Sequence, residues 1–201
     1  MKTAFRALYF LGLLAEIAIR VPRERRRRAT RMEVDRADGL EWSLVGLLSV
    51  GMLLIPGIYV TTPWLDRLDY RLPPQVERRV GRIGAVILAS ALILFWRSHA
   101  DLGRNWSTSL QLREDHRLVT GGVYRYVRHP MYASQWLWSI AQILLLQNRI
   151  AGWAGAALFV PLYVVRTPRE ERMMLERFGG EYRAYARRTG RVFPRIARRG
   201  R

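Results

Sequence analysis

The sequence has no cysteine, only three histidines (positions 99, 116 and 129) and a single lysine, Lys2. The lack of cysteine excludes disulfides, thiolate catalysis and cysteine-ligated zinc. Scattered histidines without an HExxH motif form no recognisable metal site, so we expect no metal. Acidic residues are also scarce: 16 Asp and Glu stand against 34 Lys and Arg, which gives a net charge of +18. The partners of so cationic a chain are expected to be anionic.

Long apolar stretches are abundant. Half of the 201 residues are hydrophobic, a share that a soluble domain rarely combines with such a charge. A membrane helix needs about 20 mostly apolar residues. Stretches that reach or approach this length are 5–19, 42–60, 83–96, 131–146 and 150–165. We therefore predict an all-α polytopic membrane protein with about five transmembrane helices, the first being a retained span rather than a cleaved signal peptide.

The segments between these stretches predict how the helices connect. Residues 147–149 are a three-residue link, so the two flanking helices should form an antiparallel hairpin, with small residues from Gly152 onward allowing close approach. In the polar segment 61–82, prolines argue against a long helix.

The basic tail from residue 166 is predicted to be helical. Thr167, Pro168 and Glu170 have the pattern of an N-cap, a first-turn proline and a capping-box acid, so a new helix should begin there. The pair Gly179 and Gly180 is expected to interrupt that helix.

Basic residues concentrate in alternate connecting segments. Segments 20–36, 97–128 and 166–201 hold 8, 6 and 12 of them, 26 of the 34 in the chain. The positive-inside rule places these segments and the C-terminus in the cytosol, and the N-terminus outside. The arginine-rich usage, typical of a GC-rich genome, favours a bacterial cytoplasmic membrane.

The run RERRRR at 23–28 has the composition of a nucleic-acid-binding stretch. No nucleic-acid-binding fold accompanies it. Beside a membrane helix, such a run sets topology and attracts anionic lipid. We therefore expect anionic membrane lipids as partners, and no nucleic acid.

One stretch, TGGVYRYVRHPMYASQ at 120–135, places charged and aromatic residues between apolar segments. Pro130 fits the first position of a helix and pushes His129 towards an extended conformation. Arg128 and His129 should therefore lie at a helix entrance, where backbone N–H groups and the helix dipole attract anions. The alternative is that both residues only mark where a membrane helix leaves the lipid headgroups.

These residue types suit S-adenosylmethionine. Arg128, His129 and the helix entrance can take its carboxylate. Glu170 can take its ammonium or a ribose hydroxyl. Tyr124 and Tyr132 offer ring faces to a cation.

Arg166 then remains for an anionic acceptor. Methyl transfer to a carboxylate needs alignment and a water-poor site more than acid–base chemistry, whereas an amine acceptor would need a base such as Glu170 or Glu171. NADPH also carries anionic groups and an aromatic ring, so the residue chemistry alone leaves the cofactor open.

Three motifs occur in a recognisable order: HRLVTGGVYRYVRHPMY (116–132), RTPREE (166–171) and FGGEYRAYARR (178–188), the last followed by Pro194. In these the chain resembles the integral-membrane methyltransferases of the isoprenylcysteine carboxyl methyltransferase family and its phospholipid methyltransferase relatives, over roughly residues 100–196. The resemblance implies one methyltransferase-like domain, 1–201. Its N-terminal spans and basic loop would occupy 1–96, and its cofactor-binding catalytic core 97–201.

The resemblance also implies an S-adenosyl-L-methionine site under cytosolic loops. Arg166 matches the family arginine that faces the methyl-accepting group, and Arg166 and Glu170 are the expected catalytic residues. The expected cofactor-binding residues, with Arg128 from the argument above, are Gln111, His116, Arg117, Leu118, Val119, Tyr124, Arg128, His129, Pro130, Met131, Tyr132 and Glu170.

The chain departs from the prenylcysteine enzymes on the acceptor side. Residues 141–143 read Ala-Gln-Ile where those enzymes carry Gly-Thr-Gln, and Pro168 and Arg169 replace acidic residues. The expected function is S-adenosylmethionine-dependent methyl transfer to a lipophilic or lipidated acceptor, either a carboxylate such as an isoprenylcysteine-type group or a lipid amine or thiol. The alternatives are a sterol-reductase-like NADPH enzyme, which shares an RHP-type motif, and a non-enzymatic scaffold that binds anionic lipid.

Overall fold

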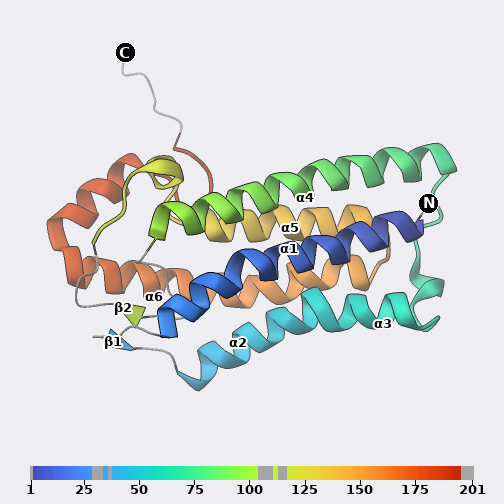
Figure 1. The fold of residues 1–201 in the computed structure, drawn as a ribbon, viewed down its shortest axis with the longest axis horizontal. Helices are drawn as coiled ribbons and strands as arrows, with labels where there is room; N and C mark the ends of the chain where they lie inside the picture. The colour runs from blue at the N-terminus through green and yellow to red at the C-terminus, as the bar shows by residue number, and fades with distance from the viewer. Residues whose placement is uncertain (1, 29–33, 36–37, 104–110, 113–116, 196–201) are drawn as a thin grey trace, which may run out of the picture.

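The computed structural model of the chain describes residues 2–28, 34–35, 38–103, 111–112 and 117–195. Its long helical stretches lie side by side, as Figure 1 shows. In chain order they are α1 (Lys2–Arg28), α2 (Gly39–Ser49) continued by the π-helical η1 (Val50–Leu54) and α3 (Ile55–Thr61), α4 (Pro74–Leu102), α5 (Pro130–Leu146) and α6 (Ala151–Arg188). The all-helical prediction is confirmed for these stretches.

Shorter elements connect the long helices. Two 3-10 turns, η2 (Asp66–Leu68) and η4 (Gly122–Arg125), lie in the connections before α4 and α5. Two strands of two residues each, β1 (Val34–Asp35) and β2 (Gln111–Leu112), pair antiparallel, a feature that the sequence analysis does not anticipate.

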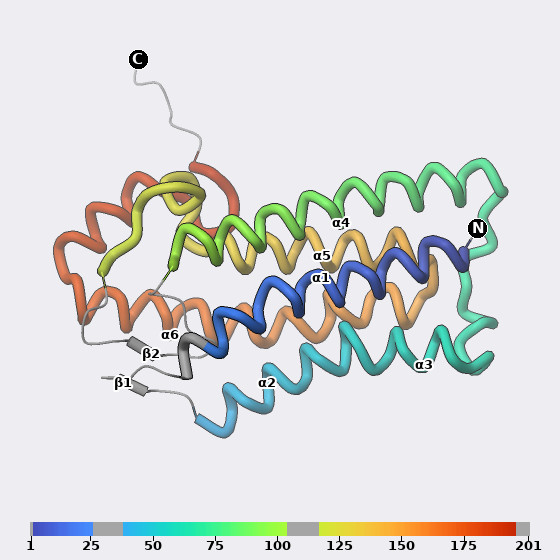
Figure 2. Tube along the Cα trace, in the orientation of Figure 1, coloured from blue at the N-terminus to red at the C-terminus, as the bar shows by residue number. Residues whose placement is uncertain are grey.

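The helices bring distant segments to a common end of the bundle. α4 packs along α5, α1 packs on both of them, and α2 and η1 pack on α6. Figure 2 shows the C-terminal end of α1, the start of α2, residues 117–129 and the distal part of α6 at one end, opposite the N-terminus. The central motif and the tail therefore share one end, as predicted.

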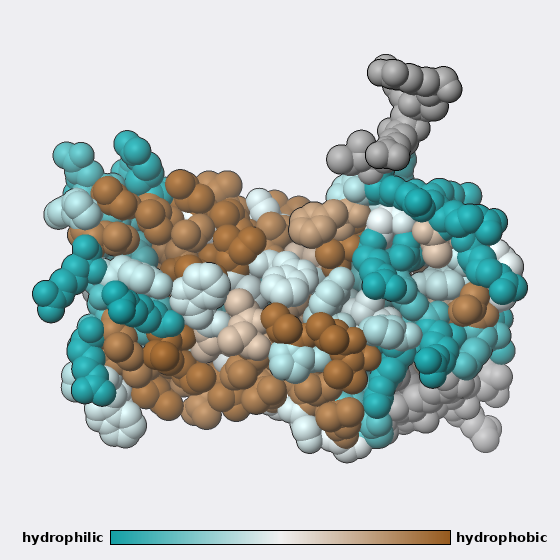
Figure 3. All heavy atoms as spheres, turned by 180° about the vertical axis from the view of Figure 1, so that it is seen from behind, coloured by the Kyte–Doolittle hydropathy of each residue, from teal (hydrophilic) through white to brown (hydrophobic). Residues whose placement is uncertain are grey.

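On the face that Figure 3 shows, apolar residues cover the middle of the bundle and polar residues gather towards its ends. Two helical stretches, Gly39–Thr61 and Pro74–Leu102, are long and apolar enough to cross a membrane, and only 28% of each apolar window is buried within the protein. Apolar helices that are mostly exposed need a non-aqueous environment, so this surface is that of an integral membrane protein.

The remaining long helices meet the criteria for a span less fully than predicted. α5 has 17 residues, and α1 carries Glu16 and Arg20 within its length. By length and composition, the described helices thus include two candidate spans where the sequence predicts about five.

Several predicted helix boundaries are wrong. α1 continues through Pro22 to Arg28, although residues 20–36 were expected to form a loop. α4 begins at Pro74, well before the expected start at residue 83. Proline at a first helical position costs no hydrogen bond, so Pro74 starts a helix rather than preventing one.

The predicted helix start at Thr167 and Pro168 is also wrong, because α6 runs through both residues. Arg166 Nε donates to Glu170 Oε1 over 2.8 Å, an i to i+4 contact that a continuous turn brings together. The predicted interruption at Gly179 is confirmed: this residue has φ 50° and ψ −117°, and the helix resumes beyond it.

The predicted hairpin between α5 and α6 is confirmed. Gln147 adopts a left-handed conformation with φ 50°, which ends α5. Asn148, two residues before the N-cap Ile150, then supports the start of α6, since its Oδ1 accepts hydrogen bonds from the backbone N–H groups of Ile150 and Ala151, each at 3.0 Å. The tight link follows from these two polar residues.

A π-helical turn in the middle of the α2–α3 stretch frees backbone carbonyls for other helices. Pro56 lacks an N–H, so it cannot bond to the carbonyl of Met52. That carbonyl instead accepts from Tyr9 Oη at 2.6 Å, and the Gly51 carbonyl accepts from Gln142 Nε2 at 2.9 Å. Gln142 also donates to the Ala151 carbonyl at 2.7 Å. These bonds tie α1, η1, α5 and α6 together inside the apolar layer.

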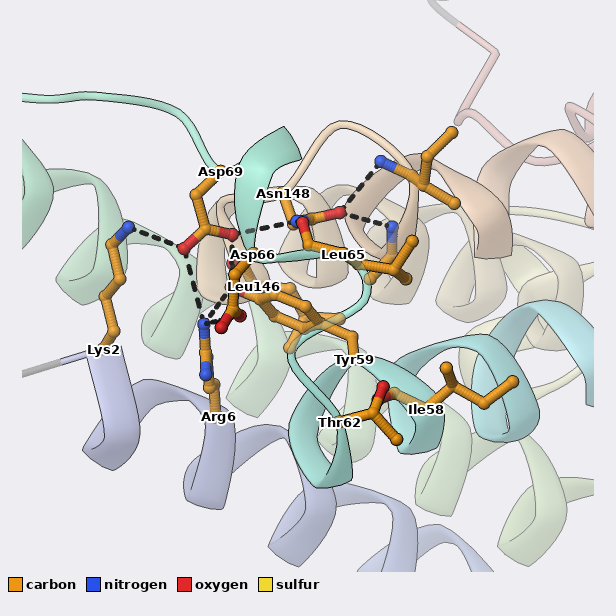
Figure 4. A network of polar contacts seen from close by, with 12 residues as sticks. Lys2, Arg6, Ile58, Tyr59, Thr62, Leu65, Asp66, Asp69, Leu146 and Asn148 are labelled. Atoms are coloured by element: carbon orange, nitrogen blue, oxygen red, sulfur yellow. Dashed lines mark hydrogen bonds and ion pairs between the residues drawn. The ribbon is translucent and has the colours of Figure 1, made fainter.

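At the end of the bundle that contains the N-terminus, Asp69 gathers polar partners from three other segments (Figure 4). Its carboxylate accepts from Lys2 Nζ at 2.9 Å, Tyr59 Oη at 2.7 Å and Asn148 Nδ2 at 2.8 Å, and lies 3.4 Å from Arg6 Nη2. This cluster joins α1, α3, the connection to α4 and the α5–α6 hairpin.

We expect Asp69→Asn to destabilise the protein by about 2–3 kcal/mol, because Lys2 and Arg6 would lose the charge that compensates them. Asp66→Asn is the matched control: its carboxylate is 56% exposed and 3.9 Å from Arg6 Nη2. Thermal unfolding in detergent measures both variants. Equal unfolding temperatures for the two would contradict this role of Asp69.

Candidate functional site

The segment before α5 is fixed onto α4 and α6 by short polar contacts. Asp101 Oδ2 on α4 accepts from the Val123 backbone N–H at 2.8 Å. Gly122, with φ 57°, lies directly against the Asp101 carboxylate, so a side chain there would meet it. Tyr185 Oη on α6 donates to the Tyr124 carbonyl at 2.7 Å. These contacts place the Tyr124 ring against the end of the bundle.

The entrance of α5 has the predicted geometry. His129 is the N-cap residue, with φ −123° and ψ 62°, and Pro130 is in the first turn. No side chain caps the helix, and its first backbone bond runs from Ala133 N to His129 O at 3.0 Å. The N–H groups of Met131 and Tyr132 thus meet no acceptor among the described residues. Such a helix start attracts an anion.

The carboxylate of Glu171 contacts three basic side chains. Its Oε1 accepts from Arg128 Nε at 3.1 Å and Nη2 at 3.0 Å and lies 3.3 Å from His129 Nε2, while its Oε2 accepts from Arg191 Nη2 at 2.8 Å. Burial raises the pKa of Glu171, but hydrogen bonds from His129 and Arg191 outweigh it and hold the pKa at about 2. The carboxylate is therefore ionised at neutral pH.

Backbone bonds reinforce the same junction. The Arg128 backbone N–H donates to the Gly190 carbonyl at 2.8 Å, and that of His129 to the Arg191 carbonyl at 2.9 Å. Arg128 Nη1 also donates to the carbonyls of Ala186 and Thr189 at the end of α6. The guanidinium of Arg128 thus binds protein acceptors and holds the tail against the α5 entrance.

Glu170, one residue before that junction, is surrounded by donors. Tyr132 Oη donates to its Oε1 at 2.6 Å, Arg166 Nε donates to the same oxygen at 2.8 Å, and His129 Nδ1 lies 3.5 Å from Oε2. Burial raises the pKa of Glu170, but the charges of Arg166 and His129 outweigh it and hold the pKa at about 2. Glu170 is thus a fixed negative charge.

His129 lies between the two carboxylates. Burial lowers its pKa, but the hydrogen bonds and charges of Glu170 and Glu171 outweigh burial, so the net shift is upward. Arg166 is similarly placed between Glu170 and Glu41, whose Oε1 is 3.5 Å from Arg166 Nη1. Charges of both signs therefore alternate across this end of the bundle.

A cavity of about 350 Å³ opens beside these charges. Most of the predicted site residues line it. They are Arg117, Leu118, Val119, Tyr124, Arg128, His129, Pro130, Met131, Tyr132, Arg166 and Glu170. Of the two others, His116 lies outside the described residues, and Gln111 belongs to β2, where only the backbone is described.

The cavity also has a wall that the sequence analysis does not assign. α1 contributes Glu16 and Arg20, and α5 contributes Gln135, whose Nε2 donates to Glu16 Oε1 at 3.1 Å. The available signal is the presence of charged residues within or directly after an apolar stretch. At the rim, Ile17 of α1 and Leu53 of η1 are 52% and 54% exposed, so the cavity reaches the apolar surface of the bundle.

The site thus combines a helical bundle that has an apolar surface with a charged cavity that reaches this surface, an arrangement that suits a lipophilic ligand. Residues 83–176 match the model of the isoprenylcysteine carboxyl methyltransferase (ICMT) family. The matched segment is a little less than half of the chain, and over it the chain is similar to that family, as the resemblance read from the sequence motifs predicts.

Individual relatives agree with the family match. The chain is 33% identical over 107 residues to protein-S-isoprenylcysteine O-methyltransferase B of Arabidopsis thaliana, an alignment that covers 53% of this chain and 52% of the relative. It is 31% identical over 120 residues to the Dictyostelium discoideum enzyme, with 57% and 49% covered. The human enzyme is 37% identical over 83 residues, with 41% and 29% covered. The chain thus spans about half the length of the Arabidopsis and Dictyostelium relatives.

A solved structure of the eukaryotic intramembrane Ras methyltransferase ICMT aligns with 82% of this chain and 55% of that one, at 23% identity and a TM-score of 0.49.

The Glu171 junction predicts an acid-sensitive stability. A carboxyl whose pKa is lowered from 4.5 to about 2 stabilises the folded protein above pH 4.5, and the contribution is lost as the pH falls towards 2. Glu171→Gln should lower the unfolding temperature at pH 7 by about 5 °C and make the loss below pH 4.5 shallower.

Melting curves from pH 7 to pH 3 in detergent measure this effect. Glu181→Gln, at an exposed position of the same helix, is the control and should follow the wild type. An acid loss as steep in Glu171→Gln as in the wild type would rule out the junction as its source.

Proposed function

We propose that the protein transfers a methyl group from S-adenosylmethionine to a lipophilic acceptor at one end of its membrane-embedded bundle. The observation that carries this proposal is the cavity, in which an uncapped helix entrance, a fixed Glu170–Arg166 pair and an apolar opening meet. The similarity of residues 83–176 to the isoprenylcysteine carboxyl methyltransferase family supports methyl transfer as the reaction class. The names of the relatives suggest an isoprenylated cysteine as one acceptor.

The residues present fit S-adenosylmethionine. A cavity of about 350 Å³ is within the range of small-molecule sites. The N–H groups of Met131 and Tyr132, together with His129, would hold the carboxylate of the cofactor. Glu170 would take its ammonium or ribose hydroxyls, and the Tyr124 ring offers an aromatic face. When bound, this cofactor supplies an electrophilic methyl group on a sulfonium.

The charges of the site favour an anionic acceptor. Arg166 lines the cavity and carries a positive charge that two carboxylates stabilise, Glu170 and Glu41. With a pKa of about 2, Glu170 is too weak a base to deprotonate an amine efficiently. A carboxylate needs no deprotonation, so a carboxylate of the isoprenylcysteine type is the acceptor that this site serves best.

The protein's contribution to the reaction is then mainly positioning. Arg166 would hold the acceptor group, Glu170 would fix both Arg166 and the Tyr132 hydroxyl, and the junction at Glu171 would close the site against water. Alignment of two reactants in a water-poor cavity is a sufficient source of rate enhancement for methyl transfer.

All five long helical stretches would be embedded in the membrane in this proposal, including those with charged or short sequences. Exposed apolar residues on α1, α4 and α6 support it: Leu14, Val86 and Val164 are each more than half exposed. The arginine-rich end that contains the site would face the cytosol of a bacterial cell and contact anionic lipid.

Binding of S-adenosylhomocysteine to the detergent-purified protein tests the cofactor. We expect saturable calorimetric binding, weakened at least about tenfold in Glu170→Gln, because a charge-assisted hydrogen bond would be lost. Glu181→Gln should bind like the wild type. Parallel titration with NADPH should give no binding. Binding of NADPH alone would move the protein to the reductases, and binding of neither would favour a scaffold.

Turnover tests the role of Arg166. With labelled S-adenosylmethionine and N-acetyl-S-farnesylcysteine as the acceptor, Arg166→Lys should lower kcat/KM by about tenfold or more, since lysine lacks the planar fork of arginine. Its affinity for S-adenosylhomocysteine should change by less than about threefold. An unchanged methylation rate in folded Arg166→Lys would remove Arg166 from the acceptor site.

A further inference from the structure

Arg20 of α1 lines the same cavity as Arg166, yet it lies outside the segment that matches the family. It follows Glu16 by one helical turn, and Leu13 and Ile17 line the cavity from the same helix. Residues spaced by three and four positions share one face of a helix. α1 thus presents to the cavity two apolar side chains, Leu13 and Ile17, next to the Glu16 carboxyl group and the Arg20 guanidinium.

The Arg20 guanidinium makes no hydrogen bond or ion pair with the part of the chain that the structure describes. Its electrostatic neighbours are Glu16, Glu24 and Arg166. Glu16 is already engaged by the Gln135 amide at 3.1 Å. Arg20 therefore differs from Arg128, whose guanidinium donates to Glu171 and to backbone carbonyls, and from Arg166, whose Nε donates to Glu170.

Arg20 and Arg166 are electrostatic neighbours of like charge that face one cavity. Glu16 and Glu24 offset part of the repulsion between the two guanidinium groups, and an anion bound between these groups would be attracted to both. Arg166 is held in place by Glu170 and Glu41, while the Arg20 donors meet no acceptor among the described residues.

We propose that Arg20 is a second acceptor-binding residue, and that a carboxylate at the end of a long apolar chain is held between Arg20 and Arg166. The apolar chain of this acceptor lies along Leu13 and Ile17 and leaves the cavity at its exposed rim. This inference rests on the proposed function for the identity of the acceptor. It adds that α1, which lies outside residues 83–176, makes the site prefer a negatively charged acceptor.

Binding of a matched pair of probes tests the proposal without catalysis. N-acetyl-S-farnesylcysteine carries one carboxylate, and its carboxamide has the same shape without the charge. In detergent, the wild type should bind the carboxylate about tenfold or more tightly than the carboxamide. In Arg20→Met the two affinities should lie within about threefold of each other, through loss of the carboxylate affinity alone.

Two further variants separate this role from a structural one. Arg20→Lys keeps the charge and should keep part of the preference. Arg23→Met, one turn further on α1, is the matched control, since Arg23 Nη1 donates to the Ile19 carbonyl and does not line the cavity. It should keep the full preference. Unfolding temperatures of all variants establish that they are folded.

The proposal is overturned if Arg20→Met retains the preference for the carboxylate, or if the wild type shows none. Failure of the proposed function has a different signature, the absence of S-adenosylhomocysteine binding to the wild type. A carboxylate preference that is lost in Arg20→Met supports the role of Arg20 in either case, because the probes are titrated with and without S-adenosylhomocysteine.

Discussion

The Glu171 carboxylate balances Arg128, His129 and Arg191, which come from the α5 entrance and from the chain beyond α6. Without it, three neighbouring positive groups would repel each other in a partly buried place. Because it lies next to Glu170, the same turn of α6 both fastens the tail and presents a second carboxylate to the cavity. Assembly of this end of the bundle and construction of the site therefore depend on adjacent residues.

Different polar contacts hold the helices together at the two ends of the bundle and in the apolar layer between them. At the end that contains the N-terminus, Asp69 accepts from cationic and hydroxyl donors, and at the other end Glu171 accepts from arginine donors. In the apolar layer between them, Gln142 and Tyr9 bind backbone carbonyls. Backbone carbonyls freed inside such a layer are costly unless they are paired. Gln142 thus has a structural role, since its amide ties η1 to the α5–α6 hairpin.

Much of the site could be predicted from the sequence because its motifs are local. Gly122, Pro130 and His129 encode a turn and a helix start, and the structure contains both. The continuity of α6 could not be predicted, because Thr167 and Pro168 have a valid starting pattern and only packing decides between the two outcomes. The position of Arg20 in the cavity could not be predicted from the sequence either, because it depends on how α1 crosses the bundle. Local rules determine turns and caps, whereas tertiary contacts determine which charges meet.

The π-helical turn at Val50–Leu54 accommodates one residue more than an α-helical turn would. Deleting a single residue there would leave an ordinary helix, but the part before the turn and the part after it would differ in phase by about 100°. In that regular helix, Gly51 could keep its contact with Ala154, or Tyr59 could keep its hydrogen bond to Asp69. Both contacts could not be kept at once. The extra residue therefore lets one helix satisfy two partners that a regular α-helix would place out of phase.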